Sequence, residues 1–287
     1  MHFVNLFLPY LLKKTSMKPR SKPYAKPPFR LPVWPFLYTL KSLYSIRICL
    51  PGWRFMSVIA DNLKRVQDRI AAAAQRSGRS LNDVTLIVVS KTWPIGVVQE
   101  AVDAGAVHLG ENRVQEAQEK VGQIVGPISW HLIGHLQRNK VKVALPLFDL
   151  IHGVDSLRLA EEISKKAVLD GKVVRVLVQV NTSGEVSKFG IGPDAAVDVV
   201  GQIADLEGIQ IEGVMTIGAF LSNPDDVRPH FVGLRQVRDG IVDAHIKGVS
   251  MATLSMGMSN DFEVAIEEGA TMVRVGTAIF GSRRSDD

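Results

Sequence analysis

The sequence predicts an α/β fold, a single (β/α)8 barrel of the TIM type, over residues 56–287. Eight short apolar runs rich in Val and Ile alternate there with amphipathic stretches. Runs that are apolar on both faces are typical of strands in a buried parallel sheet. A segment of this length also agrees with the usual barrel size of about 250 residues. The expected strands are Val84–Ser90, Val107–Gly110, Ile128–Gly134, Leu150–Val154, Val173–Val180, Ile209–Thr216, Gly248–Ser255 and Met272–Gly276.

The stretches between these runs predict helices, because their apolar residues recur at steps of three and four. Two prolines, Pro94 and Pro193, suit the first turns of helices. Asn260 followed three residues later by Glu263 resembles a capping box. The apolar faces are Ile59, Leu63, Val66 and Ile70; Val114, Ala117, Val121 and Ile124; Leu159, Ile163 and Ala167; and Phe231, Leu234, Val237 and Ile241.

A doubly wound open sheet is the alternative architecture for alternating strands and helices. Its nucleotide-binding members carry a G-x-G-x-x-G turn after the first strand. Here the first strand is followed by Ser90-Lys91-Thr92-Trp93-Pro94, which contains no glycine. The barrel is therefore favoured.

Residues 1–55 form an extension of different composition. They hold eight of the 14 prolines, all four tyrosines, the single cysteine (Cys49), ten basic residues and no acid. Prolines at this density prevent helix formation. The segment could be a targeting peptide, a disordered basic tail, or upstream sequence from a misplaced start with Met56 as the true first residue. We favour the last interpretation and expect the extension to be unstructured or non-native, outside the barrel.

Charge and cysteine content exclude several classes of protein. The net charge is +5, but ten of the 34 basic residues lie in residues 1–55, which leaves 24 against 29 acidic residues in the barrel segment. A general nucleic-acid-binding role therefore loses its support. A single cysteine rules out a disulfide framework. The sequence contains no uninterrupted apolar run of about 18 residues, so no membrane-spanning helix is predicted.

Polar residues gather at the carboxyl ends of the expected strands, where barrels of this class place their active sites. Lys91 follows the first strand directly. A lysine there is commonly a solvated terminus, but partial desolvation lowers the pKa of the amine and lets it attack an aldehyde. The others are Glu111-Asn112-Arg113, His131, His135, His152, Asp155, Asn181, Ser183, Thr216, Ser255, Arg274 and Thr277.

The loops after the last two strands predict a phosphate site. They read Ser255-Met256-Gly257-Met258-Ser259 and Arg274-Val275-Gly276-Thr277. Small residues let backbone N–H groups approach an anion, and these two loops are the recurrent phosphate site of the barrel. Arg274 lies within an apolar run, so its guanidinium requires an anionic or acceptor partner.

Other arrangements predict less. His131 and His135 are spaced four apart, but Gly134 interrupts them and no cysteine or Glu-x-x-His accompanies them, so we expect no metal. Glu111, Asn112 and Arg113 could be the first turn of a helix and nothing more; otherwise a free acid near Lys91 would support acid–base chemistry. A lysine and a phosphate site at the same end of the barrel suit a phosphorylated aldehyde as ligand. Pyridoxal 5'-phosphate (PLP) is the obvious member of that class.

Residues 56–287 resemble the pyridoxal phosphate homeostasis protein family, whereas residues 1–55 do not. One departure is Gly153, where the family more often has serine. The matching motifs are Val88-Val89-Ser90-Lys91-Thr92, Gly110 to Glu116, Trp130 to Gln137 with Asn139-Lys140, Val180 to Gly184 with Ser187, Lys188 and Gly190, Met215 to Gly218, and Leu254 to Gly281.

The resemblance implies a fold-type III barrel that holds PLP as a Schiff base on Lys91. It implies that Arg274 faces the pyridine nitrogen and that Asn112 lines the ring. It further implies that Ser255, Met256, Gly276 and Thr277 hold the phosphate.

The resemblance also implies a cytoplasmic cofactor carrier with no catalytic activity, a monomer or weak dimer that meets PLP-dependent apoenzymes transiently and binds neither nucleic acid nor membrane. The alternative is an amino-acid racemase of the same barrel type, whose second base is a tyrosine and which carries an extra C-terminal β-domain. Residues 56–287 contain no tyrosine, and the sequence ends shortly after Gly281. An arginine at the pyridine nitrogen also disfavours protonation there and weakens the electron sink.

Overall fold

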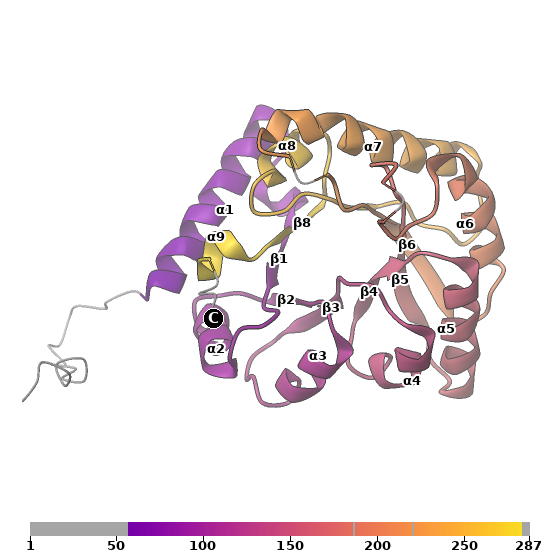
Figure 1. Ribbon diagram of the computed structural model, residues 1–287, viewed down its shortest axis with the longest axis horizontal. Helices are drawn as coiled ribbons and strands as arrows, with labels where there is room; N and C mark the ends of the chain where they lie inside the picture. The colour runs from indigo at the N-terminus through magenta and orange to yellow at the C-terminus, as the bar shows by residue number, and fades with distance from the viewer. Residues whose placement is uncertain (1–56, 186, 220, 283–287) are drawn as a thin grey trace, which may run out of the picture. The chain divides into compact units, whose positions relative to one another are not determined.

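The computed structural model describes residues 57–185, 187–219 and 221–282, and these form a closed barrel of eight parallel strands in the order β1 to β8. Pairing of β1 with β8 closes the barrel, so the open doubly wound sheet is excluded. The strands form the centre of Figure 1. Their bounds are β1 Thr85–Val89, β2 His108–Glu111, β3 Ser129–Leu132, β4 Leu150–Val154, β5 Val174–Gln179, β6 Ile209–Met215, β7 Thr253–Ser255 and β8 Met272–Val275.

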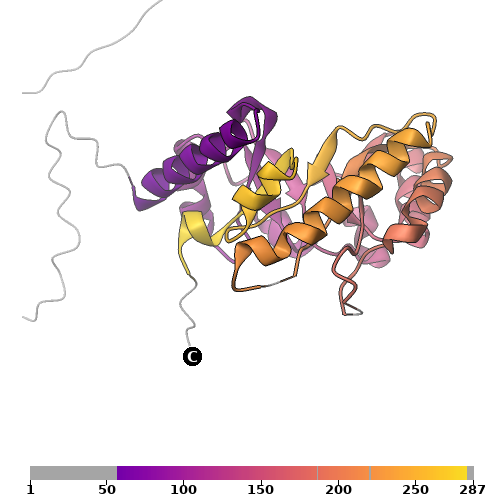
Figure 2. The same cartoon turned by 90° about the horizontal axis from the view of Figure 1, so that it is seen from above.

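Helices surround the strands on the outside (Figure 1), and the turned view in Figure 2 shows α7, drawn in orange, running along the outer surface. Pro94 occupies the N-cap position of α2, directly before its first turn, and Pro193 opens a short 3-10 turn before α6. The bounds are α1 Val58–Arg76, α2 Ile95–Asp103, α3 Val114–Lys120, α4 Val141–Ala144, α5 Leu157–Leu169, α6 Ala196–Ala204, α7 Arg228–Asp243, α8 Phe262–Glu267 and α9 Thr277–Phe280.

The first helix, α1, covers the join between the first and last strands. Ser57 caps it by accepting a hydrogen bond from the Ala60 N–H at 3.2 Å. The helix packs against α8 and α9, which lie beside it in Figure 1. An ion pair of 3.0 Å joins Arg69 to Glu263, and the Asn62 amide donates to the Ile279 carbonyl at 2.7 Å. The two ends of the barrel segment are thus held together.

Alternation along the strands divides the apolar residues between two regions. Val88 packs into the large core between strands and helices, whereas its neighbours Ile87 and Val89 join a small separate cluster with Ile133. A second small cluster contains Leu150, Leu177 and Met215. These two clusters supply apolar side chains to the barrel interior, which side chains fill in barrels of this class.

Three local predictions were wrong. The helix α3 ends at Lys120, because Val121 is extended and Gly122 has a φ of +87°, so the apolar period to Ile124 continues past the helix. The strand β7 is confined to Thr253–Ser255, since the segment from Gly248 begins in a left-handed turn.

The expected capping box at Asn260 and Glu263 is the third. The N-cap of α8 is Asp261, and Glu263 instead pairs with Arg69 on α1. The predictions for residues 1–55, and their boundary with the barrel, lie outside the described residues. Within the described part, no helix is both long and apolar enough to cross a membrane.

Candidate functional site

The exit of β1 holds Lys91 in a constrained turn. Lys91 is half-buried, and the next residue, Thr92, has a φ of +66°. A β-branched residue in the left-handed region is strained and persists only where its surroundings fix it. The Glu116 carboxylate of α3 accepts a hydrogen bond from the Thr92 N–H at 2.6 Å. Trp93 stacks on Phe280 of α9, with ring centroids 5.4 Å apart.

A buried ion pair between Lys120 and Glu111 also holds the start of this turn. The Lys120 Nζ donates to the carbonyl of Ser90 and to Glu111 Oε1, both at 2.7 Å, and the Ser90 hydroxyl donates to that same carboxylate oxygen. Burial raises the pKa of Glu111, and the hydrogen bonds from Lys120 and Ser90 oppose this rise. Glu111 lies at the end of β2 in a buried pair with Lys120, which corrects its assignment to the first turn of a helix.

Arg274 is a buried cation in the interior of the barrel. Its side chain lies on β8 and is 4% exposed. One nitrogen, Nη1, donates to Ser255 Oγ at 2.6 Å, and Nη2 donates to the Thr216 carbonyl at 2.8 Å. Burial lowers the pKa of Arg274 to about 10, and the charge of Asp261 opposes that change. Among the described residues no carboxylate forms an ion pair with Arg274. The two groups that accept its hydrogen bonds, a hydroxyl and a carbonyl, are neutral.

The loops after β7 and β8 meet at a serine. Ser259 Oγ accepts hydrogen bonds from the Gly276 N–H at 3.2 Å and the Ala278 N–H at 3.4 Å. Two backbone donors therefore converge on one oxygen, the arrangement that also suits an anion oxygen. Gly257 makes the first loop possible, since its φ is +92° and a Cβ there would lie 2.6 Å from the Cβ of Ala265. Ser259 is not among the predicted phosphate-binding residues, although it lies inside the predicted loop.

The structure distributes the predicted phosphate residues unevenly. Gly276 and Thr277 lie at the converging N–H groups, and Thr277 is exposed at the start of α9. Met256 is fully buried, and its N–H donates to the Met272 carbonyl. The Ser255 hydroxyl is in contact with Arg274 and His152. Asn112, half-buried, follows β2 at the same end of the barrel as Lys91.

Three histidines line the barrel interior in a continuous hydrogen-bonded series. His108 Nδ1 lies 3.1 Å from His131 Nε2, and His131 Nδ1 lies 3.0 Å from His152 Nε2. Burial lowers the pKa of all three, that of His131 to about 3 and that of His152 well below its ordinary value. His131 and His152 are among the polar residues predicted near the strand ends, but no spacing predicts the series, because its members lie on three different strands.

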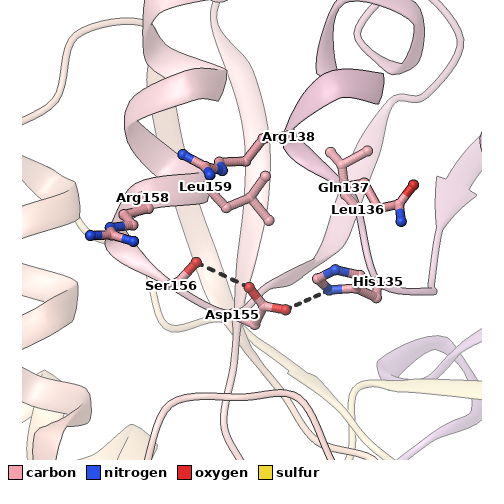
Figure 3. Close-up of a pocket in the computed structure, with 8 residues that line it drawn as sticks. All are labelled: His135, Leu136, Gln137, Arg138, Asp155, Ser156, Arg158 and Leu159. Carbon is pink, nitrogen blue, oxygen red and sulfur yellow. Dashed lines mark hydrogen bonds and ion pairs between the residues drawn. The ribbon is translucent and has the colours of Figure 1, made fainter.

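His135 lies outside this series, in a cavity of about 280 Å³ between the ends of β3 and β4 (Figure 3). Its Nδ1 lies 2.7 Å from the Asp155 carboxylate, and its ring stacks on Phe189 with centroids 3.9 Å apart. His131 and His135 thus have separate partners, and the spacing of four brings them to no common site. The cavity lining is His135, Leu136, Gln137, Arg138, Asp155, Ser156, Arg158 and Leu159.

The fold and this site define a class of protein. The family model for the N-terminal domain of alanine racemase matches residues 62–284, so the chain has the barrel domain of that class. More particularly, the chain belongs to the pyridoxal phosphate homeostasis protein family. A protein of that name from Aquifex aeolicus (strain VF5) is 44% identical over 225 residues, which cover 78% of this chain and 98% of the relative.

Two further relatives agree. The pyridoxal phosphate homeostasis protein of Escherichia coli (strain K12) is 40% identical over 232 residues, covering 79% of this chain and 98% of that protein. The structure of PipY from Synechococcus elongatus PCC7942 with PLP bound superposes with a TM-score of 0.68 at 33% identity, over 78% of this chain and 100% of that one.

The buried pair of Glu111 and Lys120 yields a stability prediction. Lys120→Met should lower the free energy of unfolding by about 3–5 kcal/mol, because it leaves a buried carboxylate without its cation. The double variant Lys120→Met/Glu111→Gln should recover most of this loss, since no buried charge then remains. Urea denaturation of the three proteins checks this; a double variant as unstable as the single one would contradict it.

The low pKa of His131 yields a pH prediction. The imidazole is neutral in the folded protein down to about pH 3 but becomes protonated in the unfolded chain below about pH 6.5. The unfolded state therefore binds more protons, and stability falls as the pH drops from 6.5 to 3. His131 contributes up to about 1.4 kcal/mol per pH unit to this fall. His131→Asn should flatten the curve of unfolding free energy against pH, whereas parallel curves would refute this assignment.

Proposed function

We propose that this chain is a carrier of PLP that serves the homeostasis of the cofactor in the cell. When bound, PLP supplies an aldehyde that reacts with amines and a ring that accepts electrons. In this proposal Lys91 Nζ condenses with the aldehyde to a Schiff base, and one water is released. Arg274 faces the ring nitrogen, and the loops after β7 and β8 hold the phosphate.

The buried Arg274 is the observation that carries this proposal. A guanidinium in a barrel interior, whose hydrogen-bond partners in the described part of the chain are a hydroxyl and a backbone carbonyl, is suited to a further acceptor. A neutral pyridine nitrogen is such an acceptor, and the fixed charge of Arg274 opposes protonation of that nitrogen. The residues present thus fit PLP.

The phosphate end of the site is supported by the N–H groups of Gly276 and Ala278. Both point at one oxygen, Ser259 Oγ, from the start of α9. A phosphate oxygen accepts from the same donors, and charge makes such hydrogen bonds stronger. Gly276 lies close to β1, where a Cβ on it would be 3.2 Å from the Val89 carbonyl oxygen. This closeness supports a phosphate position next to β1, the strand that leads to Lys91.

A carrier is preferred over a racemase for two reasons in the chain itself. All four tyrosines lie in residues 1–55, so residues 56–287 supply no tyrosine as a second base. Arg274 also keeps the ring nitrogen unprotonated, which weakens the stabilisation of a carbanion. Direct assay of amino-acid racemisation separates the two functions. A cytoplasmic location, transient contact with PLP-dependent apoenzymes, and a monomer or weak dimer remain predictions.

The role of Lys91 can be tested by trapping. Reduction of the PLP-loaded protein with borohydride should fix a pyridoxyl group on Lys91, because reduction makes the C–N bond permanent. Peptide mass mapping locates the adduct. The Lys91→Ala variant should lack the yellow colour of the PLP-loaded protein. Lys142 is an exposed lysine on α4, and its variant Lys142→Ala should keep that colour. An adduct only on another lysine would rule out Lys91 as the attachment point.

The role of Thr277 can be tested with two ligands. Thr277→Val should weaken PLP binding about ten- to a hundredfold, since a hydrogen bond to a charged group contributes roughly 1.5–3 kcal/mol. Binding of unphosphorylated pyridoxal should stay the same. Thr85→Val, at the amino end of β1, is the matched control. Equal weakening of both ligands in a titration would show that Thr277 does not recognise phosphate.

A further inference from the structure

A single line of hydrogen bonds crosses the barrel interior from β2 to β8. It runs from His108 through His131 and His152 to Ser255 Oγ, which lies 2.9 Å from His152 Nδ1, and ends at Arg274. His131, His152 and Ser255 are buried, whereas His108 is half-buried and forms the outer end. Five polar side chains on five strands thus form one connected series.

The chemistry of Arg274 sets the direction of this series. A guanidinium only donates hydrogen bonds, so Ser255 Oγ must accept from Nη1. The remaining partner of the Ser255 hydroxyl in the described part of the chain is His152 Nδ1, to which it donates. A neutral imidazole has one donor and one acceptor nitrogen, so His152 then donates from Nε2 to His131 Nδ1. The same step repeats at His131, which donates from Nε2 to His108 Nδ1.

The buried histidines stay neutral, which this arrangement requires. Desolvation disfavours a charged imidazole at His131 and His152, and Arg274 adds a repulsive positive charge near His152. The groups that act on the outer end, His108, are the carboxylate of Asp149 and the guanidinium of Arg175, of opposite sign. Either neutral tautomer pairs each buried nitrogen, but only hydrogen on Nε2 leaves His152 Nδ1 as an acceptor for the Ser255 hydrogen.

We propose that His152 is a positioning residue for Arg274, acting through Ser255, and that His131 and His108 fix the tautomer in which it does so. With its own hydrogen directed to His152, Ser255 presents a lone pair to Arg274. If His152 carried hydrogen on Nδ1, Ser255 Oγ would accept from both His152 and Arg274, and the Ser255 hydrogen would have no acceptor among the described residues. The inference rests on the proposed function in one respect, namely that Arg274 faces the ring of PLP.

The first arm of the test needs no ligand. Nitrogen-15 spectra of the histidine rings in the full-length protein at neutral pH should show three neutral imidazoles protonated at Nε2, whose resonances His108→Asn, His131→Asn and His152→Asn assign. Hydrogen on Nδ1, or a charged ring, at His131 or His152 would overturn the proposal. This arm stands even if the protein binds no PLP, in which case the proposed function alone fails.

The second arm uses PLP as the probe. His152→Leu removes the acceptor for Ser255 and should weaken PLP binding roughly tenfold and shift the visible absorption of the bound cofactor. His152→Asn should have the affinity and the visible absorption of the wild type, because the amide oxygen of asparagine can accept the hydrogen bond from Ser255 and needs no particular tautomer to do so. The control is Leu177→Ala, which creates a cavity in the barrel interior away from the hydrogen-bonded series. It should lower the midpoint of thermal unfolding without shifting the visible absorption of the bound cofactor.

These outcomes separate positioning from structural support. A wild-type spectrum in His152→Leu, or an equal spectral shift in Leu177→Ala, would overturn the positioning role. If His152→Leu does not fold, Ser255→Ala removes the next group in the series, the hydroxyl that accepts from Arg274, with a smaller change in volume, and should shift the spectrum likewise. Failure of the wild-type protein itself to bind PLP would refute the proposed function, and the nitrogen-15 result would still decide the inference.

Discussion

The charge of Arg274 is the constraint on which the interior of this barrel depends. A cation removed from water must be surrounded by acceptors, and the barrel provides them from β6 and β7. One of those acceptors is a hydroxyl with a hydrogen of its own, which requires another acceptor in turn. The requirement passes from strand to strand until His108 reaches the half-buried end. A polar layer therefore crosses an otherwise apolar interior because of one charged side chain.

Much of the architecture follows from local sequence pattern. Alternating apolar runs predict the eight strands, and β4 agrees with its prediction to the residue. The position of Arg274 among apolar neighbours also predicts a buried cation that needs an acceptor. These features depend on residues close together in the chain, where period and composition carry the information.

The remaining features depend on residues far apart in the chain. Glu111 and Lys120 meet Ser90 only once β1 and β2 are paired and α3 packs behind them. His108, His131 and His152 lie on separate strands, so no spacing reveals their contact. Glu263 carries a local capping signal, but its ion pair with Arg69, distant in sequence, prevails. Tertiary contacts thus decide the polar residues, whereas local pattern decides most of the strands and helices.

The stack of Trp93 on Phe280 joins the two ends of the candidate site mechanically. Trp93 belongs to the turn that carries Lys91, and Phe280 ends the helix that begins at Thr277. A displacement of either segment therefore pulls on the other. A molecule held at both ends would therefore be bound by two segments that this aromatic contact ties together.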